Sequence, residues 1–142
     1  MGNGKEMKMP APAKILVVDD DPDFVEATRI VLESASYCVV VANDGVEALK
    51  RAGEEQPDLI ILDVIMPLQD GFVTCAELKK SPEFEGIPVL MLTSFTQNVS
   101  NTSLSVQQGL MLEADDFVDK PVAPQELLAR VGRLLRQHAS LA

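Results

Sequence analysis

The chain has 142 residues, of which 46% are apolar and 4% aromatic, a composition that suits a single α/β domain with an aliphatic core. Its 22 acidic and 12 basic residues give a formal charge of −10, which argues against direct binding of nucleic acid. No apolar run reaches the roughly 18 residues of a membrane span, and the first residues lack the apolar core of a signal peptide, so we expect a cytoplasmic protein without membrane contact.

The chain is predicted to contain one domain with short ends. Residues 1–13 include two glycines and two prolines without periodicity, which is typical of a disordered leader. The domain is expected to span residues 14–138 and to be followed by a tail over residues 139–142. Cys38 and Cys75 fall in a predicted strand and a predicted helix, which favours free thiols over a disulfide.

The first predicted strand, residues 15–18, runs into three consecutive acids. Asp21 is predicted to cap a helix that begins at Pro22, and this leaves Asp19 and Asp20 without a structural role. Two adjacent acids at a strand end repel each other unless a cation lies between them. The face of this helix that is expected to meet the core carries Phe24, Ala27, Thr28, Val31, Leu32 and Ala35.

A second strand is predicted over residues 37–42, followed by a short helix that ends near Gly53. The third strand, residues 59–62, is a continuous apolar run that ends on Asp63, as in a strand buried on both faces of a parallel sheet. Taken alone, Asp63 fits a residue that opens a turn about equally well. The inward residues of the short helix are expected to be Val46, Leu49 and Ala52.

A third helix is predicted to stop before Ser81 and a fourth strand to cover residues 87–92. Residues 97–112 are polar first and then apolar, so we expect a helix with an irregular start. A short fifth strand, residues 117–118, precedes a last helix that begins at Pro124. The inward residues are expected to be Phe72, Val73, Ala76 and Leu78 in the third helix, and Leu127, Leu128, Val131, Leu134 and Leu135 in the last.

Five strands that alternate with five helices predict a flavodoxin-like, doubly wound (βα)5 sandwich with a five-stranded parallel sheet. If the strand order is 2-1-3-4-5, the first and third strands are neighbours and their terminal acids meet in one crevice. Thr93 and Lys120 follow the fourth and fifth strands at the same edge. Singly, Thr93 is as well explained as a strand-end hydroxyl and Lys120 as a surface charge.

The carboxylates of Asp19, Asp20 and Asp63, without a His or Cys partner, predict a site for Mg²⁺ or a similar hard cation. Lys120 adds a positive charge and Thr93 a hydroxyl group. Together these groups are typical of a phosphoryl-transfer site in which Asp63 is the nucleophile.

These motifs resemble the receiver domain of two-component response regulators. The resemblance rests on Val17-Val18-Asp19-Asp20, Leu62-Asp63 with Met66-Pro67 and Asp70-Gly71, Leu92-Thr93-Ser94 and Asp119-Lys120-Pro121, and it covers about residues 14–138.

The resemblance implies a fixed role for each motif residue. Asp63 would accept a phosphoryl group from the phosphohistidine of a partner kinase, and Thr93 and Lys120 would hold its oxygens. Mg²⁺ would be held by Asp20, Asp63, the backbone carbonyl of Ile65 and, through water, Asp19. Phe117 occupies the switch position, whose ring is expected to turn inward when Thr93 moves toward the phosphate.

The resemblance also implies that two apolar residues lie beside the path of attacking water. Ile65 lies two positions after Asp63, and Phe95 lies two positions after Thr93. We hypothesise that both exclude water and give a long-lived acyl phosphate.

One region departs from the pattern of the family. The interval from Thr93 to Lys120 is 120 − 93 = 27 positions, which is several residues longer than expected, and Glu113 replaces the usual glycine. The fourth helix is therefore expected to be displaced or extended.

The expected partners are a sensor histidine kinase or a histidine phosphotransfer protein, and downstream either a protein partner or a C-terminal effector domain of a longer regulator. Leu134 and Leu135 could form part of a homodimer interface through the last two helices. Packing in the core explains these two leucines equally well. Two rival functions are a pseudo-receiver that binds partners without phosphorylation and a haloacid dehalogenase type phosphatase that uses Asp19 and Asp21.

Overall fold

The computed structural model describes residues 12–63, 71–93 and 114–141. Within these ranges the chain forms five strands and four helices. In chain order they are β1 (Lys14–Val18), α2 (Pro22–Ser34), β2 (Cys38–Ala42), α3 (Gly45–Glu55), β3 (Leu59–Asp63), α4 (Gly71–Lys80), β4 (Val89–Thr93), β5 (Asp116–Asp119) and α7 (Pro124–Leu141).

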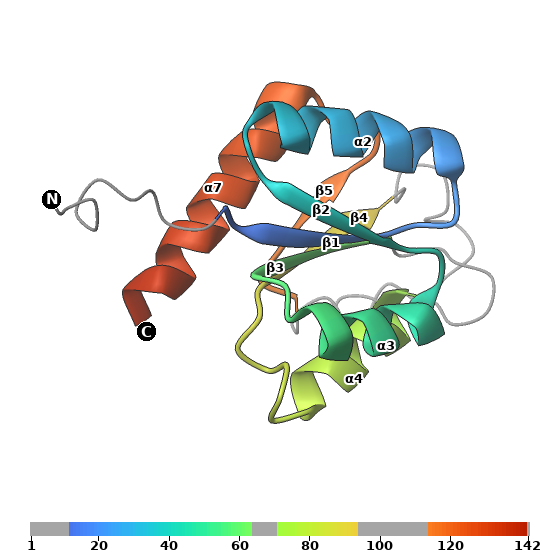
Figure 1. Cartoon of the computed structure of the whole chain (residues 1–142), viewed down its shortest axis with the longest axis vertical. Coiled ribbons are helices and arrows are strands. Elements are labelled where there is room, and N and C mark those ends of the chain that lie inside the picture. Colours follow the sequence, from blue (N-terminus) through green and yellow to red (C-terminus); the bar gives the residue numbers. More distant parts are fainter. Residues whose placement is uncertain (1–11, 64–70, 94–113, 142) are drawn as a thin grey trace, which may run out of the picture.

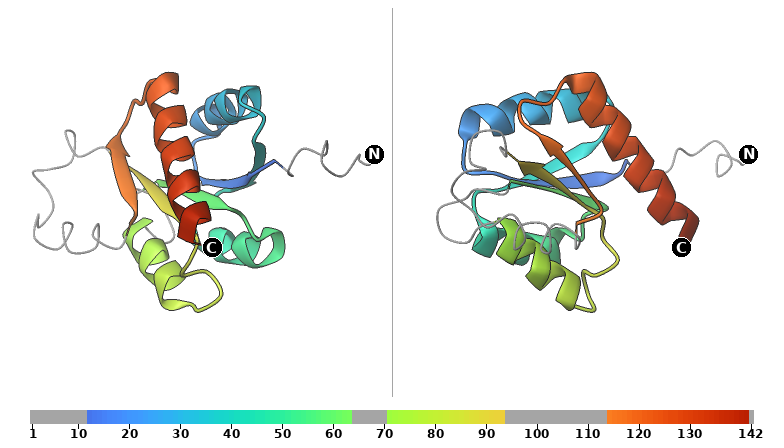
Figure 2. Two further views of the ribbon diagram at one scale, coloured as in Figure 1. Left: turned by 90° about the vertical axis from the view of Figure 1, so that its left-hand side faces the viewer. Right: turned by 180° about the vertical axis from the view of Figure 1, so that it is seen from behind.

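The five strands form one parallel sheet in the order β2-β1-β3-β4-β5, which confirms the predicted topology. Helices α2 and α7 cover one face of the sheet and α3 and α4 the other (Figures 1 and 2). Because all neighbouring strands pair in parallel, the five strands end at the same edge of the sheet.

The central strands β1 and β3 are buried on both faces, as their continuous apolar runs predicted. Alternate residues enter opposite halves of the core: Ile15 and Leu59 join the cluster that contains residues of α2 and α7, whereas Leu16 joins the cluster with residues of α3 and α4. The sheet therefore lies between two apolar layers, one on each face.

The fourth and fifth strands have other limits than predicted. Strand β4 begins at Val89 and not at residue 87, because Ile87 still belongs to a turn in which its N–H donates to the carbonyl of Phe84 (2.9 Å). Strand β5 is longer than residues 117–118, since Asp116 and Asp119 also pair with β4.

The core-facing residues of two helices were predicted only in part. In α3, Ala52 is fully buried as predicted, but Val46 is 59% exposed and Ala48, which the prediction omitted, is fully buried. In α4, Val73 is 44% exposed and its neighbour Thr74 is fully buried. Small side chains let a helix lie close to the sheet, and a count of large apolar residues gives them too little weight.

Helix α2 shows a smaller error of the same kind. Ala27 is exposed, and Val25, which the prediction omitted, is buried together with Thr28 and Leu32.

The ends of the chain differ partly from the prediction. Helix α7 continues to Leu141, so the tail predicted over residues 139–142 starts inside the helix. The predicted leader lies mostly outside the described residues, and its disorder remains a prediction. Neither the exposed Cys38 nor the buried Cys75 forms a disulfide, as expected. Among the described helices, none combines the length and the apolar character needed to cross a membrane.

The corrected orientation of α4 can be tested with two alanine variants of the same helix. Leu78 is fully buried, so we expect Leu78→Ala to lower the free energy of unfolding by about 2–5 kcal/mol. Val73→Ala should change it by no more than about 0.5 kcal/mol. Urea denaturation measures both, and a loss for Val73→Ala that equals the loss for Leu78→Ala would contradict the orientation.

Candidate functional site

The loop after β1 is shaped by its own acids. The carboxylate of Asp21 caps α2 by accepting hydrogen bonds from the backbone N–H groups of Asp23 (3.0 Å) and Phe24 (3.4 Å). The N–H of Asp21 in turn donates to Oδ1 of Asp19 (3.0 Å). This confirms the predicted cap and gives Asp19 a fixed orientation.

Three carboxylates meet at the carboxyl edge of the sheet. Asp19 and Asp20 follow β1, and Asp63 ends the neighbouring strand β3, whose Leu62 pairs with Val18. One carboxylate oxygen from each acid lies within 4.8 Å of the others. Asp19 and Asp63 are almost inaccessible, with 1% and 5% of their surface exposed, whereas Asp20 is exposed. The structure thus brings together the three acids that the sequence singled out.

Lys120 reaches into this group from the loop after β5. Its Nζ lies 2.9 Å from Oδ2 of Asp19 and 3.3 Å from Oδ1 of Asp63. Burial of the ammonium group would lower its pKa, but the hydrogen bond to Asp19 and the charge of Asp63 outweigh burial and raise the pKa of Lys120 above its ordinary value. Lys120 therefore carries a full positive charge at neutral pH.

Phe24 is a residue of the site that the sequence analysis assigned only to the core. Its ring centroid lies 4.3 Å from Nζ of Lys120. The two residues come from opposite ends of the domain, so no spacing in the sequence signals this contact.

Two further candidates lie on β4 and β5. Thr93 ends β4, and its backbone pairs with Asp119, the residue before Lys120. Phe117 is 48% exposed. Its carbonyl accepts a hydrogen bond from Nη1 of Arg130 in α7 (3.3 Å). The two residues therefore occupy adjacent strands, and Phe117 is tied to the last helix through its backbone.

Several predicted features fall outside the described residues. These are Ile65 and Phe95, the helix predicted within residues 97–112, and Glu113. Their predicted roles remain predictions.

The charges of the site suit a divalent cation. Asp19, Asp20 and Asp63 carry three negative charges and Lys120 one positive charge, which leaves an excess of two negative charges. All the side-chain ligands are carboxylate oxygens, the type that Mg²⁺ prefers. The carboxylate of Asp21 caps α2, which does not suit the catalytic role that the haloacid dehalogenase alternative would give it.

Comparison with known proteins agrees with this geometry. Residues 15–132 match the response regulator receiver domain family. The alkaline phosphatase synthesis transcriptional regulatory protein PhoP of Bacillus subtilis is 43% identical over 124 residues, which are 87% of this chain and 49% of PhoP. The chain thus spans about half the length of the curated relatives that it matches.

Solved structures give the same result. A putative response regulator from Chloroflexus aurantiacus has a TM-score of 0.77 and 35% identity over 88% of this chain and 98% of its own. The receiver domain of sensor histidine kinase PA1611 from Pseudomonas aeruginosa, solved with a magnesium ion coordinated in the active site cleft, has a TM-score of 0.75 and 25% identity over 88% of this chain and 98% of its own. With the family match over most of its length and the same fold, the chain belongs to the response regulator receiver domains of two-component signalling.

Proposed function

We propose that this receiver domain accepts a phosphoryl group on Asp63 from the phosphohistidine of a sensor histidine kinase or a histidine phosphotransfer protein. The observation that carries the proposal is the position of Lys120, whose ammonium group contacts both Asp19 and Asp63 at the carboxyl edge of the sheet. A carboxylate that is nearly buried beside a fixed cation is suited to receive a group whose negatively charged oxygens that cation can bind.

The proposed transfer needs no general base, because the carboxylate of Asp63 is already the nucleophile. One carboxylate oxygen of Asp63 attacks phosphorus while the bond from phosphorus to the imidazole nitrogen breaks, and the bonding electron pair leaves with the imidazole. Lys120 and the hydroxyl of Thr93 would bind phosphoryl oxygens and so stabilise part of their negative charge.

The acids fit a magnesium ion as the cofactor. Asp20 and Asp63, the backbone carbonyl of Ile65 and, through water, Asp19 would hold it. When bound, Mg²⁺ would neutralise the phosphoryl oxygens together with Lys120. The metal-bound receiver domain of PA1611 supports this assignment.

The one histidine of this sequence, His138, is not placed to donate the phosphoryl group to Asp63. The chain contains one histidine, His138, and its ring lies in α7, with Nδ1 3.0 Å from the carbonyl of Leu134 and Nε2 3.6 Å from Asp115, which precedes β5. Asp115 lies at the start of β5, whereas the acids of the site lie at the strand ends, so His138 is at the opposite edge of the sheet.

We propose that phosphorylation is read out through β5 and α7. Asp116 forms ion pairs with Arg130 (3.0 Å) and Arg133 of α7, and Arg130 also binds the carbonyl of Phe117. A turn of the Phe117 ring that shifts the backbone of β5 would therefore also shift α7 through these contacts. Two or three charge-assisted contacts of about 1.5–3 kcal/mol each are enough to shift a population between two such states.

The recipient of the signal is either a separate protein or an effector domain of a longer regulator. PhoP is named a transcriptional regulatory protein, and the chain corresponds to about half of it. The chain's charge of −10 supports a protein partner and not direct contact of this domain with DNA.

The acceptor residue can be identified by intact mass after incubation with Mg²⁺ and acetyl phosphate. We expect the wild type to gain one phosphoryl group and Asp63→Ala to gain none, because the variant lacks the nucleophile. Asp23→Ala, which removes an exposed acid in the first turn of α2, should still be modified. If the wild type stays unmodified and also fails to bind fluoroberyllate, the pseudo-receiver alternative is correct.

Lys120→Met should make the stability of the protein depend more strongly on Mg²⁺, because the ammonium group and the metal ion both compensate the charges of Asp19 and Asp63. Without its ammonium group the nearly buried Asp19 and Asp63 lose their counter-charge, so we expect the free energy of unfolding at pH 7 to fall by about 1.5–3 kcal/mol in the absence of Mg²⁺. The pKa of Lys120 is raised in the folded protein. The stabilisation that Lys120 gives to the wild type is therefore complete below pH 10.5 and is lost only as the pH rises above that value. Mg²⁺ should raise the melting temperature of Lys120→Met more than that of the wild type.

Lys79→Met is the matched control for this experiment. Nζ of Lys79 lies 2.8 Å from Asp115, and the two lysine side chains are similarly exposed, 16% for Lys79 and 21% for Lys120. Lys79 is distant from the three acids. Lys79→Met should therefore be less stable than the wild type, but Mg²⁺ should raise the melting temperatures of both by the same amount. An equal response of both variants to Mg²⁺ would contradict the assigned metal site.

The lifetime of the acyl phosphate tests the proposed roles of Ile65 and Phe95. If these apolar side chains keep water from the phosphorylated Asp63, Ile65→Asn and Phe95→Glu should each shorten the half-life of the adduct severalfold. Timed mass spectrometry after removal of acetyl phosphate measures the decay. Unchanged decay in both variants would refute water exclusion and leave Asp63 as the acceptor unaffected.

A further inference from the structure

The ring of Phe24 forms one wall of the space that holds the ammonium group of Lys120. The distance of 4.3 Å from Nζ to the ring centroid lies within the range of a cation–π interaction. The aromatic face carries partial negative charge, so it attracts the ammonium group as the two carboxylates do. Nζ thus lies beside Asp19 and Phe24 from the β1–α2 stretch and beside Asp63 from the end of β3.

Phe24 is the more firmly anchored of the two residues. Its backbone N–H is held by the cap residue Asp21 (3.4 Å), and its half-buried side chain packs against the core cluster shared by α2 and α7. Lys120 has a long, flexible side chain that is 21% exposed. The ring can therefore fix the lysine, whereas the lysine has little means to fix the ring.

The contact places the cation where the proposed reaction needs it. A lysine free to move into solvent would have to be recaptured when phosphoryl oxygens arrive, whereas a lysine already held beside Asp63 stabilises them without that cost. The ring also covers one side of the ammonium group, which reduces its contact with water and strengthens its attraction to negative oxygens.

We infer that Phe24 is a positioning residue for Lys120: its ring holds the ammonium group beside Asp19 and Asp63, ready to bind the phosphoryl oxygens. This inference rests on the function proposed above. Phe24 acts on the reaction through its contact with Lys120.

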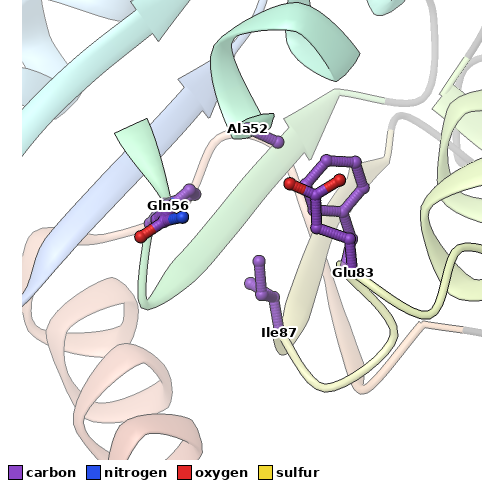
Figure 3. A pocket seen from close by; sticks show the side chains of 6 residues that line it. Ala52, Gln56, Glu83 and Ile87 are labelled. Carbon is purple, nitrogen blue, oxygen red and sulfur yellow. The ribbon is translucent and has the colours of Figure 1, made fainter. Parts of the chain in front are cut away.

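The test compares three purified variants of the full chain with the wild type. Phe24→Leu keeps an apolar side chain but removes the aromatic face, Phe24→Tyr keeps the face, and Phe84→Leu makes the same change at another half-buried phenylalanine. Phe84 lines a pocket with Ala52, Gln56 and Ile87 near the C-terminal end of α3, on the other side of the sheet from α2 (Figure 3).

The first readout is the rate of Asp63 phosphorylation by saturating acetyl phosphate and Mg²⁺, followed by intact mass. We expect Phe24→Leu to be about two- to fivefold slower, the rate equivalent of a partly exposed cation–π interaction. Phe24→Tyr and Phe84→Leu should react at the wild-type rate. A small-molecule donor is used so that a lost contact with a partner kinase cannot slow the reaction.

The second readout is the chemical shift of the Lys120 ε-methylene protons, assigned with Lys120→Met. Protons held over an aromatic face are shifted upfield, so the wild type and Phe24→Tyr should show the shift and Phe24→Leu should lose it. A merely structural contribution of Phe24 to folding would not produce this signature.

The outcomes separate this inference from the proposed function. A wild-type rate in Phe24→Leu, an equal slowing in Phe84→Leu, or absence of the upfield shift in the wild type would overturn the positioning role and leave Asp63 as the acceptor. Failure of the wild type to accept a phosphoryl group would overturn the proposed function and the positioning role together.

Discussion

The placement of one lysine between two nearly buried carboxylates is the interaction on which this site depends. Asp19 and Asp63 have 1% and 5% of their surface exposed, and two acids in such surroundings are costly unless a cation lies beside them. Lys120 supplies it, at 2.9 Å and 3.3 Å. Since Asp19 follows β1 and Lys120 follows β5, the site forms only when β1, β3, β4 and β5 are paired.

The same electrostatic principle operates at the other end of the sheet, with a different consequence. Lys79 of α4 lies 2.8 Å from Asp115, whose carboxylate also accepts a hydrogen bond from the N–H of Val89 (2.8 Å). There one acid meets one lysine, and Asp115 joins α4 to the starts of β4 and β5. At the carboxyl edge three acids share one lysine, and the uncompensated negative charge is what suits that edge to a divalent cation.

Sequence patterns failed where packing against the sheet depends on small or polar side chains. The pattern of large apolar residues placed Val46 and Val73 in the core, yet both are largely exposed. Ala48 and Thr74 lie against the sheet instead, because a helix can approach the sheet closely where its side chains are small. The start of β4 was misplaced for a related reason, since Ile87 is apolar but forms a turn.

The amino-acid sequence by itself determined the alternation of strands and helices, the cap at Asp21 and the acids at the ends of β1 and β3, because apolar runs and capping residues act over short distances. It also identified Lys120 as a candidate. Only the tertiary structure decided that Lys120 contacts both acids and that Phe24 lies against it, because these contacts join residues from 120 − 63 = 57 to 120 − 19 = 101 positions apart. No local pattern encodes such a contact; it follows from the way the sheet brings its strand ends together.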